Sequence, residues 1–597
     1  MNLNWDLRPI YADEAAFEND LTKFKDVYVP KIATFQGKLG NEADFMEYLQ
    51  TEREVDALLE RLYLYASCDS SLDKRDVKRS ERLARVSSAY ENFAANASYI
   101  DPEILSLGQD YVNAFLAKHP EEKAEFDFSF DKLFREQKHI RSATEEKLLS
   151  AYAGLSGEGS ELYSMLSVAD YKPKKVTLSN GEEVEVNLSN WTHLIPEVPT
   201  AEDRQKVFES LYSWYDEHKN AYGEIYNAVL RAEVAEMKNR GYASILEEHL
   251  YGNNIPLSVF QNLIEVASTE NAALKKYYEL RRKALGLTKH RSYDRFLQLA
   301  KSDKKYSYEE AKELFFASLK DFPADYQEKA REVTKEGYVD VLPHAGKRTG
   351  AFSTGGANIH PYILLNFEGT LEDVFTLAHE SGHSIHTLYA EENQPITKQD
   401  YSIFVAEIAS TFNEHNLLDY LLKRDDLSRE DKIALLQKAI DEIVATFYRQ
   451  TLFAHYEYDI ALKAEKDEPI NYQVLSEEMV KLYQQYYGID IKEENVKELV
   501  WAYIPHLFYT PFYVYQYATS FTASMLLYQR VKEGQPNAFE NHISLLKMGG
   551  SDYPVEEVRK AGVDFTKKET FYACPRRMEE LVNELEVLLN EKNVIIR

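Results

Sequence analysis

The chain contains very few cysteines. Only Cys68 and Cys574 occur among its 597 residues, far apart in sequence. Two thiols in a chain of this size do not form a disulfide framework, and a reducing compartment such as the cytoplasm is the natural environment. The first twenty residues have no basic segment followed by an apolar run, so we expect no secretory signal there.

Basic residues are in deficit. The chain has 70 Lys and Arg against 99 Asp and Glu, a formal net charge of −29. This balance disfavours nucleic acid and anionic membrane surfaces as partners, because both call for basic patches. The acidic excess is compatible with a cationic partner, but it could also serve solubility alone, because a total charge does not show where on the protein the charges lie.

A transmembrane run is also missing, although residues 500–529 resemble one at first sight. This segment has no Asp, Glu, Lys or Arg, and its length permits a crossing. However, Tyr, Thr, Ser, Gln, His and two prolines are spread through its middle, and such groups are costly in hydrocarbon. We therefore expect a buried helical segment near a polar cavity and no membrane contact.

Most of the chain has the spacing of apolar residues that is typical of helices. Apolar residues recur at three- and four-residue spacing across residues 46–68, 133–155, 204–242 and 428–465. Strand signals are few: residues 174–190 predict a β-hairpin around Asn180-Gly181, and residues 350–369 have an extended character. The sequence predicts a mainly α protein with a small β element just before residue 370. Prolines near residues 190–205 suggest a helical lobe with a hairpin (1–195) and a larger, mainly helical catalytic domain (196–597).

The stretch "TLAHESGHSIHTL", residues 376–388, contains the candidate metal ligands and the candidate general base. Thr370 with Asp373 three positions later resembles a capping box and predicts a helix over about 371–390. On this helix His379 and His383 lie one turn apart on the same face, where two imidazoles can bind one Zn²⁺. Glu380 between them can accept a proton from a water whose pKa the zinc lowers to roughly 7. The alternative is an ordinary helix with solvated or hydrogen-bonded His and Glu.

A third ligand separates these interpretations. The position six residues after the second histidine is Tyr389, so the metzincin pattern fails. A second helix should begin near residue 401, after the loop containing Pro395, and Glu407 is the one acid in its first three turns. From His383 to the end of the first helix is roughly 10 Å, and from the start of the second helix to Glu407 roughly 9 Å. An antiparallel helix pair therefore brings Glu407 level with the histidines, and a His2Glu set leaves a coordination position open.

Two nearby residues have more than one possible role. His386 is three positions after His383 and could approach the same face. Because three ligands are already supplied, we expect His386 to pack in the core or to support a ligand residue. Glu414 lies seven residues after Glu407 on the same helical face. It could accept a hydrogen bond from the second nitrogen of a ligand imidazole, or it could be a solvated glutamate.

These motifs are similar to those of oligoendopeptidase F, in the thimet oligopeptidase group of zinc peptidases. The resemblance rests on "AHESGHSIHT" and "FVAEIASTFNE" and extends to "PHLFYTPFYVYQYATSF" at 505–521 and "LKMGGSDYPVEEVRKAGVD" at 546–564. It implies one zinc ion per chain and cytoplasmic cleavage of oligopeptides, not of folded proteins. It also implies two helical lobes around a deep substrate channel.

The resemblance further implies that a histidine and tyrosines from the late segment face the tetrahedral intermediate. His506 is the only histidine of that segment. Tyr513 is seven residues later and shares its face if the segment is helical, although Pro511 could disturb the register. Tyr515 and Tyr517 are alternatives. The chemistry needs hydrogen-bond donors aimed at a developing oxyanion.

Residues 350–366 offer a second way of contacting substrate. An extended peptide could add to a strand there as a further strand, and Gly355 and Gly356 would permit close backbone approach. A structural hairpin turn is the alternative role for the two glycines.

The sequence thus predicts a zinc endopeptidase whose metal is held by His379, His383 and Glu407. Two other interpretations compete with it. One is a peptide-binding or scaffold protein with a structural zinc site, in which His386 would be the fourth ligand. The other is an exopeptidase of the same group, such as a dipeptidyl carboxypeptidase.

Overall fold

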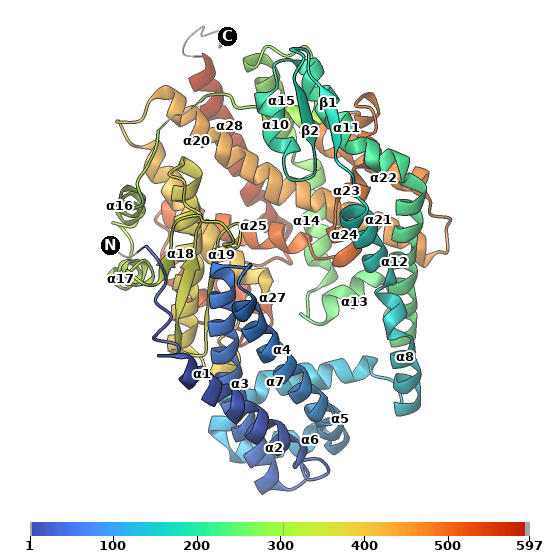
Figure 1. The fold of residues 1–597 in the computed structure, drawn as a ribbon, viewed down its shortest axis with the longest axis vertical. Helices are drawn as coiled ribbons and strands as arrows, with labels where there is room; N and C mark the ends of the chain where they lie inside the picture. Colours follow the sequence, from blue (N-terminus) through green and yellow to red (C-terminus); the bar gives the residue numbers. More distant parts are fainter. Residues whose placement is uncertain (1–2, 302–303, 591–597) are drawn as a thin grey trace. The chain divides into compact units, whose positions relative to one another are not determined.

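The computed structural model describes residues 3–301 and 304–590, and it is mainly helical with two small sheets (Figure 1). The predicted fold class is therefore confirmed. In the described part of the chain no helix is both long enough and apolar enough to cross a membrane. Residues 500–529 are instead broken into short helices and turns before a longer helix.

The chain forms two compact units that alternate along the sequence. Unit 1 comprises residues 1–138, 304–423 and 523–563, and unit 2 comprises 139–303, 424–522 and 564–597. The sequence places its one boundary near residue 195, which lies inside unit 2, whereas the chain passes between the units at other points. The predicted metal-binding helix belongs to unit 1, and the late segment with His506 belongs to unit 2.

Unit 1 consists of helices around a small sheet. Its elements are α1 (Glu14–Lys23), the π-helix η1 (Phe24–Tyr28), α2 (Val29–Ala33), α3 (Glu42–Leu72), α4 (Val77–Ala97), α5 (Ile100–Leu107), α6 (Gln109–Lys118), α7 (Pro120–Glu136), α16 (Tyr308–Ser318), α17 (Ala324–Val333), β3 (Val339–Asp340), β4 (Phe352–Gly356), β5 (Ile359–Leu364), α18 (Leu371–Asn393), η5 (Ile396–Lys398), α19 (Ile403–Leu422), α26 (Ala538–Leu546) and α27 (Pro554–Lys560).

Unit 2 is helical apart from one hairpin. Its elements are α8 (Ala143–Ser156), α9 (Glu158–Ser164), the π-helix η3 (Met165–Ala169), β1 (Lys174–Thr177), β2 (Glu183–Val186), α10 (Trp191–Glu197), α11 (Ala201–Glu217), α12 (Lys219–Arg240), α13 (Ile245–Tyr251), α14 (Leu257–Thr269), α15 (Ala272–Ala284), η4 (Ser292–Phe296), α20 (Arg429–Ile443), the π-helix η6 (Val444–Tyr448), α21 (Arg449–Glu465), α22 (Tyr472–Tyr487), η7 (Ile491–Glu493), η8 (Lys497–Leu499), α23 (Val500–Tyr503), α24 (His506–Tyr509), η9 (Lys568–Tyr572) and α28 (Ala573–Asn590). The short helix η2 (Gln137–His139) and α25 (Tyr515–Lys532) each continue from one unit into the other.

Both predicted β elements are present. Strands β1 and β2 pair antiparallel, as the Asn180-Gly181 signal predicts. In unit 1 the strand order is β3-β5-β4, with β5 in the centre, parallel to β3 and antiparallel to β4. Strand β4 is therefore an edge strand. Positive φ angles at Ala357 and Asn358 (53° and 59°) form the tight turn between β4 and β5, as a two-residue hairpin turn requires.

The core of unit 1 fixes one long helix against this sheet. Buried apolar side chains of α3, including Leu58 and Leu62, share a hydrophobic cluster with Tyr362 and Leu364 of β5. Each fully buried side chain of this size stabilises the fold by about 1.5–3 kcal/mol. The packing brings α3 beside β4, where both elements border the site described next.

Candidate metal centre

Helix α18 begins where the sequence predicts. Thr370 Oγ1 accepts a hydrogen bond from the Asp373 amide (3.2 Å), and Asp373 Oδ2 accepts one from the Thr370 amide (2.8 Å). This reciprocal pair satisfies two amides that the first helical turn cannot bond internally. The helix extends to Asn393, a few residues beyond the predicted end.

Helix α19 packs antiparallel against α18 (Figure 1). Asn413 Nδ2, in the middle of α19, donates to the Ala378 carbonyl (3.2 Å). Tyr401, just before α19, donates to the carbonyl of His383, which is later in α18 (3.4 Å). Later residues of α19 thus face earlier residues of α18, as the sequence argument for the third ligand requires.

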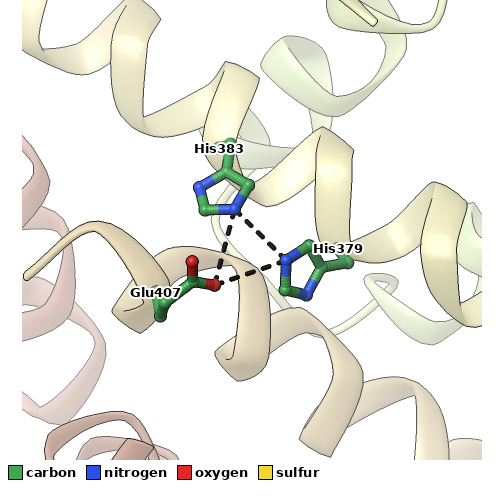
Figure 2. A group of neighbouring side chains, drawn as sticks. All are labelled: His379, His383 and Glu407. Carbon is green, nitrogen blue, oxygen red and sulfur yellow. Dashed lines mark hydrogen bonds and ion pairs between the residues drawn. The ribbon is translucent and has the colours of Figure 1, made fainter. Parts of the chain in front are cut away.

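Three potential ligand atoms converge between the two helices (Figure 2). Glu407 Oε2 lies 3.3 Å from His379 Nε2 and 3.6 Å from His383 Nε2. The two imidazole Nε2 atoms are 3.2 Å apart. Among the described residues, these three side chains are the one group of His, Cys, Asp and Glu close enough to bind a metal together.

The spacing fits a tetrahedral zinc ion. Ligand atoms roughly 2.0–2.1 Å from a tetrahedral Zn²⁺ are about 3.3–3.4 Å from each other, and the three observed separations of 3.2, 3.3 and 3.6 Å lie around this value. Two imidazoles and a carboxylate form the ligand set of many catalytic zinc sites, which keep a fourth position open.

Both imidazoles are held by their second ring nitrogen. Glu414 Oε1 lies 2.5 Å from His379 Nδ1, and Glu414 is buried. The Ala406 backbone makes the corresponding hydrogen bond with His383. Such partners fix the ring orientation and tautomer and raise ligand basicity. Of the two roles that the sequence left open for Glu414, the structure shows support of a histidine.

Glu380 lies against the same space from a different direction. It is buried, and the Ser353 amide of β4 hydrogen-bonds to it. Burial raises the pKa of the Glu380 carboxyl to about 7, although the neighbouring His379 opposes the rise. A general base works best when its pKa is near the working pH. A nearby metal cation would lower this pKa and favour the carboxylate.

His386 and Tyr389 take no part in the ligand group. The His386 ring is buried and stacks on Tyr401 with ring centroids 3.7 Å apart. Tyr389 donates a hydrogen bond to Asp325 Oδ2 (2.7 Å) and is fully buried. His386 therefore packs, as expected, and does not complete a closed four-ligand site with the triad.

The triad opens into a cavity of about 740 Å³. Glu380 and both histidines line it, together with Glu407 and residues 351–357, which contain the whole of edge strand β4. A volume within the roughly 300–1,000 Å³ range of ligand sites suits a short segment of substrate. All of its lining residues belong to unit 1.

Carboxylates line another part of this cavity. Asp56 and Glu60 come from α3, Glu391 from the end of α18, and Asp400 from the connection to α19. Burial raises the pKa of each of these groups, to about 6 for Asp56 and to about 8 for Glu391. None of these four residues is predicted from the sequence: Asp56 and Glu60 reach the cavity through contacts of α3 with β4, some 300 residues away, and Glu391 and Asp400 lie in a segment predicted to be a loop.

The two glycines of β4 allow close packing inside the protein. A Cβ atom at Gly355 would lie 2.8 Å from Pro361 Cα and 3.2 Å from Thr387 Cγ2 of α18. At Gly356, φ is +149°, and a Cβ would lie 3.3 Å from Glu60. Both residues border the cavity and end the strand, and Ala357 and Asn358 form the turn itself.

The late segment forms an aromatic cluster in unit 2. The His506 ring is roughly parallel to that of Tyr513 (centroids 6.3 Å apart) and perpendicular to that of Tyr517 (6.2 Å). The segment is not one helix: α24 ends at Tyr509, and Phe512 has a φ of +55°. The chain bend, not a shared helical face, brings Tyr513 to His506. Tyr515 is buried and packs on Phe260 instead.

Comparison with known proteins identifies the relatives of this chain. Residues 194–574 match peptidase family M3, and residues 103–172 match Oligopeptidase F. Group B oligopeptidase PepB of Streptococcus agalactiae is 32% identical over 98% of this chain and 97% of its own length. An oligoendopeptidase F homolog of Lactococcus lactis is 33% identical over 99% of this chain and 98% of its own.

Solved structures agree with this relationship. A protein from Chlamydophila abortus superposes with a TM-score of 0.90 at 31% sequence identity, over 98% of this chain and 98% of that chain. The resemblance to oligoendopeptidase F that the sequence motifs indicate is thus confirmed along nearly the full length.

Proposed function

Since the chain belongs to peptidase family M3 and is a peptide hydrolase, we propose that it is a zinc-dependent oligoendopeptidase that cleaves internal bonds of short, unfolded peptides. One observation carries the proposal: His379, His383 and Glu407 present three ligand atoms 3.2–3.6 Å apart in a cavity that Glu380 also lines. An oligopeptidase needs a metal, a base and room for an extended substrate, and this arrangement can supply all three.

His379, His383 and Glu407 would bind one Zn²⁺ per chain. Bound zinc supplies Lewis-acid chemistry: it polarises the scissile carbonyl and lowers the pKa of a coordinated water to roughly 7. The carboxylate of Glu414 and the backbone of Ala406 keep the two imidazoles in the ligand orientation.

Glu380 is the general base. It accepts a proton from the attacking water and then donates it to the leaving amine. Its burial and its hydrogen bond from the Ser353 amide hold the carboxylate in one position at the cavity wall. A base held in this way needs little rearrangement before proton transfer.

His506 and Tyr513 donate hydrogen bonds to the developing oxyanion, and Tyr517 contacts the substrate beside them. The mutual contacts of these three rings support a common role. Preorganised donors aimed at the oxyanion typically account for about 2.7–4 kcal/mol of barrier reduction each. The proposed substrate role of Tyr515 has less support, since its ring is buried against Phe260.

The substrate lies along β4 as an additional strand. Edge strand β4 borders the cavity, and the backbone groups of an edge strand can pair with an extended peptide. Gly355 and Gly356 leave this edge without side chains at its end. A structure with a substrate-like peptide bound should show backbone hydrogen bonds to β4; a peptide bound elsewhere in the cavity would contradict this placement.

The expected location is the cytoplasm, and the expected selection of unfolded peptides reflects a deep channel between two lobes. The buried free thiols of Cys68 and Cys574 are compatible with a reducing compartment. Cell fractionation tests the location. Comparing cleavage of a short peptide with cleavage of the same sequence inserted in a folded protein tests the size selection.

The decisive experiment combines metal analysis with product masses. The purified protein should contain about one zinc per chain and cleave a quenched fluorescent peptide, and a chelator should abolish cleavage until zinc is restored. A peptide blocked at both ends should yield internal fragments. Zinc without hydrolysis would favour the scaffold alternative, and stepwise release of dipeptides from a free carboxyl terminus would favour the exopeptidase.

A further inference from the structure

Unit 2 contains a second cavity, of about 210 Å³, that the peptidase mechanism does not use. It is bordered by cationic and aromatic side chains and one carboxylate: Tyr278, Arg295, Asp441, Arg449, Tyr483 and Tyr487. All of these residues belong to unit 2, whereas the metal triad belongs to unit 1.

The two arginines at this cavity have no anionic partner. Within residues 3–301 and 304–590, neither Arg295 nor Arg449 forms an ion pair with a carboxylate, and Arg449 Nε is buried without any hydrogen-bond partner. The guanidinium groups rest on rings, Arg295 on Phe296 (4.5 Å to the centroid) and Arg449 on Phe453 (5.3 Å). Leaving a guanidinium desolvated and unpaired is costly, and an anion between the two groups would remove that cost.

The one carboxylate at the cavity is already engaged. Asp441 accepts hydrogen bonds from Tyr277 (2.7 Å) and Gln437 (3.2 Å), and its Oδ2 lies 3.9 Å from Arg281 Nη1. Arg281 and, less strongly, Arg295 stabilise its charge, so this single carboxylate serves two arginines and leaves Arg449 without a carboxylate partner.

A third basic side chain, that of Lys497, packs against a tyrosine of the cavity lining. The Lys497 ammonium is buried, donates to Tyr212 (3.1 Å) and contacts the ring of Tyr483. Burial holds the pKa of Lys497 well below its usual range, and Arg295 and Arg449 lower it further. The nearest balancing group is Glu494, which also accepts a hydrogen bond from the Ser292 amide (2.8 Å). The cavity lining therefore contains two guanidinium groups, and the basic side chain of Lys497 packs against Tyr483 of the same lining.

The rest of the lining is shaped for a small ligand. Tyr487 packs edge-on against Tyr278 (5.8 Å) and at a tilt against Tyr483 (5.2 Å). Among the described residues, no hydrogen bond engages the hydroxyls of these three tyrosines. The π-helical turn η6 supplies Val444 and Ala445 to the lining and directly precedes Arg449. Single π-helical turns occur frequently at functional sites.

From this arrangement we propose that the cavity binds a small oxyanion, a phosphate or carboxylate group, between Arg295 and Arg449. Planar guanidinium groups bind both anions through paired, charge-assisted hydrogen bonds. The tyrosine hydroxyls donate to the remaining oxygens, and the rings cover a small apolar or aromatic group attached to the anion. A volume of 210 Å³ is below the roughly 300–1,000 Å³ of drug-sized ligand sites, so nucleotides and peptides are too large.

The test uses the full-length protein and three probes: inorganic phosphate, phenyl phosphate and benzoate. Binding is measured by calorimetry and by the rise in Tm, with sodium chloride at equal ionic strength as the reference. We expect saturable binding of at least one probe to the wild type. We expect Arg449→Gln and Arg295→Gln to weaken it at least tenfold. Arg231→Gln is the control, because Arg231 is an exposed arginine of α12 paired with Glu224 and should leave the Kd unchanged.

Comparing the affinities of the three probes also identifies the kind of anion that the cavity binds. Tighter binding of the two phosphates indicates a phosphate site, and tighter binding of benzoate a carboxylate site. In the absence of probe, each glutamine variant should have the Tm of the wild type or a higher one, because one of two neighbouring like charges is removed. A variant with such a Tm that fails to bind has lost binding and not folding. Arg449→Lys keeps the charge without the planar fork and should bind with intermediate affinity. No saturable binding to the wild type, or wild-type affinity in both glutamine variants, would overturn the proposal.

Discussion

Gly382 of α18 lies directly against the backbone of Ser410 on α19. A Cβ atom at Gly382 would lie 2.6 Å from Ser410 Cα and 2.6 Å from the Ala409 carbonyl oxygen. Real Cβ atoms do not approach backbone so closely, so this glycine sets the separation of the two helices. Because His379 and His383 are on one helix and Glu407 is on the other, the same contact sets the geometry of the triad.

We therefore expect Gly382→Ala to force α18 and α19 apart. Overpacking of this kind typically costs about 1–3 kcal/mol of folding free energy, and the displacement of Glu407 should weaken zinc binding at least tenfold. The measurements are thermal unfolding and zinc competition with a chromogenic chelator. Gly154→Ala is the matched control, because Gly154 lies in helix α8 with open space around its Cβ position. It should stabilise slightly and keep zinc affinity.

Glu380→Gln should retain zinc and lose nearly all hydrolysis. The amide keeps the size of the side chain but cannot accept the water proton, so we expect kcat to fall by about 10²–10⁴-fold. Zinc content by mass spectrometry and peptide turnover are the readouts. Glu372→Gln, an exposed position on the same helix, should behave as wild type. Full activity of Glu380→Gln would remove the role assigned to this residue.

The sequence predicts the triad because its signals are local and periodic. The spacing of His379 and His383 and the cap at Thr370 depend on one helix. Glu407 follows from the rise per residue of two antiparallel helices, since few alternatives exist within three turns. The core cluster joins α3 to β5, by contrast, through contacts across some 300 residues, and no local pattern encodes them. Asp56 and Glu60 of the acidic part of the cavity were missed for this reason.

The late segment shows a second limit. Helical spacing favours Tyr513 as the partner of His506, but Pro511 ends helical continuity, and Phe512 adopts a positive φ. That conformation is stabilised by tertiary contact, because the Phe512 amide donates to Glu457 on α21 (2.8 Å). Tyr513 still reaches His506, through a bend whose direction the sequence does not reveal, although Pro511 marks its place. The pairing was predicted for a reason that proved wrong.

Glu414→Gln should weaken zinc binding without abolishing it. Glu414 supports His379 from 2.5 Å away and is not itself a member of the triad. Loss of such a supporting carboxylate typically costs about 10–100-fold in metal affinity or activity. Glu407→Gln removes a ligand and should cost much more. Zinc dissociation constants of both variants, measured side by side, check the order. Equal losses would argue that Glu414 binds the metal directly.

The stability of the protein should depend on Glu391 at high pH. Burial and the nearby Glu392 raise the pKa of this carboxyl to about 8 from 4.5, although the Gly356 and Ile359 backbones oppose the rise. The folded state therefore binds a proton that the unfolded state releases, so the group destabilises the fold increasingly as pH rises from about 4.5 to 8. Asp56, Glu60 and Asp400 at the same cavity add negative charge in this range.

Glu391→Gln keeps the size of the side chain and one acceptor oxygen, and it removes the titration. Relative to wild type, it should gain stability between pH 6 and pH 8.5, and the difference in unfolding free energy should change by about 2–3 kcal/mol, because each pH unit between 6 and 8 contributes about 1.4 kcal/mol. Urea unfolding at the two pH values measures this. Glu328→Gln, an exposed change on α17, should show no such pH dependence. A difference that is independent of pH would mean that Glu391 is ionised in the folded protein throughout.

Tyrosine-to-phenylalanine changes in the late segment should separate catalysis from packing. Tyr513 and Tyr517 face His506 and are partly exposed, whereas Tyr515 is buried against Phe260. If the Tyr513 hydroxyl donates to the oxyanion, its removal should lower kcat by about 10²–10³-fold with little change in KM. The Tyr517 change should act mainly on KM, as expected for a group that contacts the substrate equally in the ground and transition states.

Tyr515→Phe is the internal control of this series. It removes a hydroxyl from a ring that packs on its neighbours, and we expect this hydroxyl to contribute almost nothing to the binding of substrate or transition state. Both kcat and KM should therefore stay within about twofold of wild type. His506→Gln should lower kcat as Tyr513→Phe does, and the double variant should lose less than the product of the two single losses if both groups bind one oxyanion. A kcat loss confined to Tyr515→Phe would reverse the assignment and place the catalytic hydroxyl on α25.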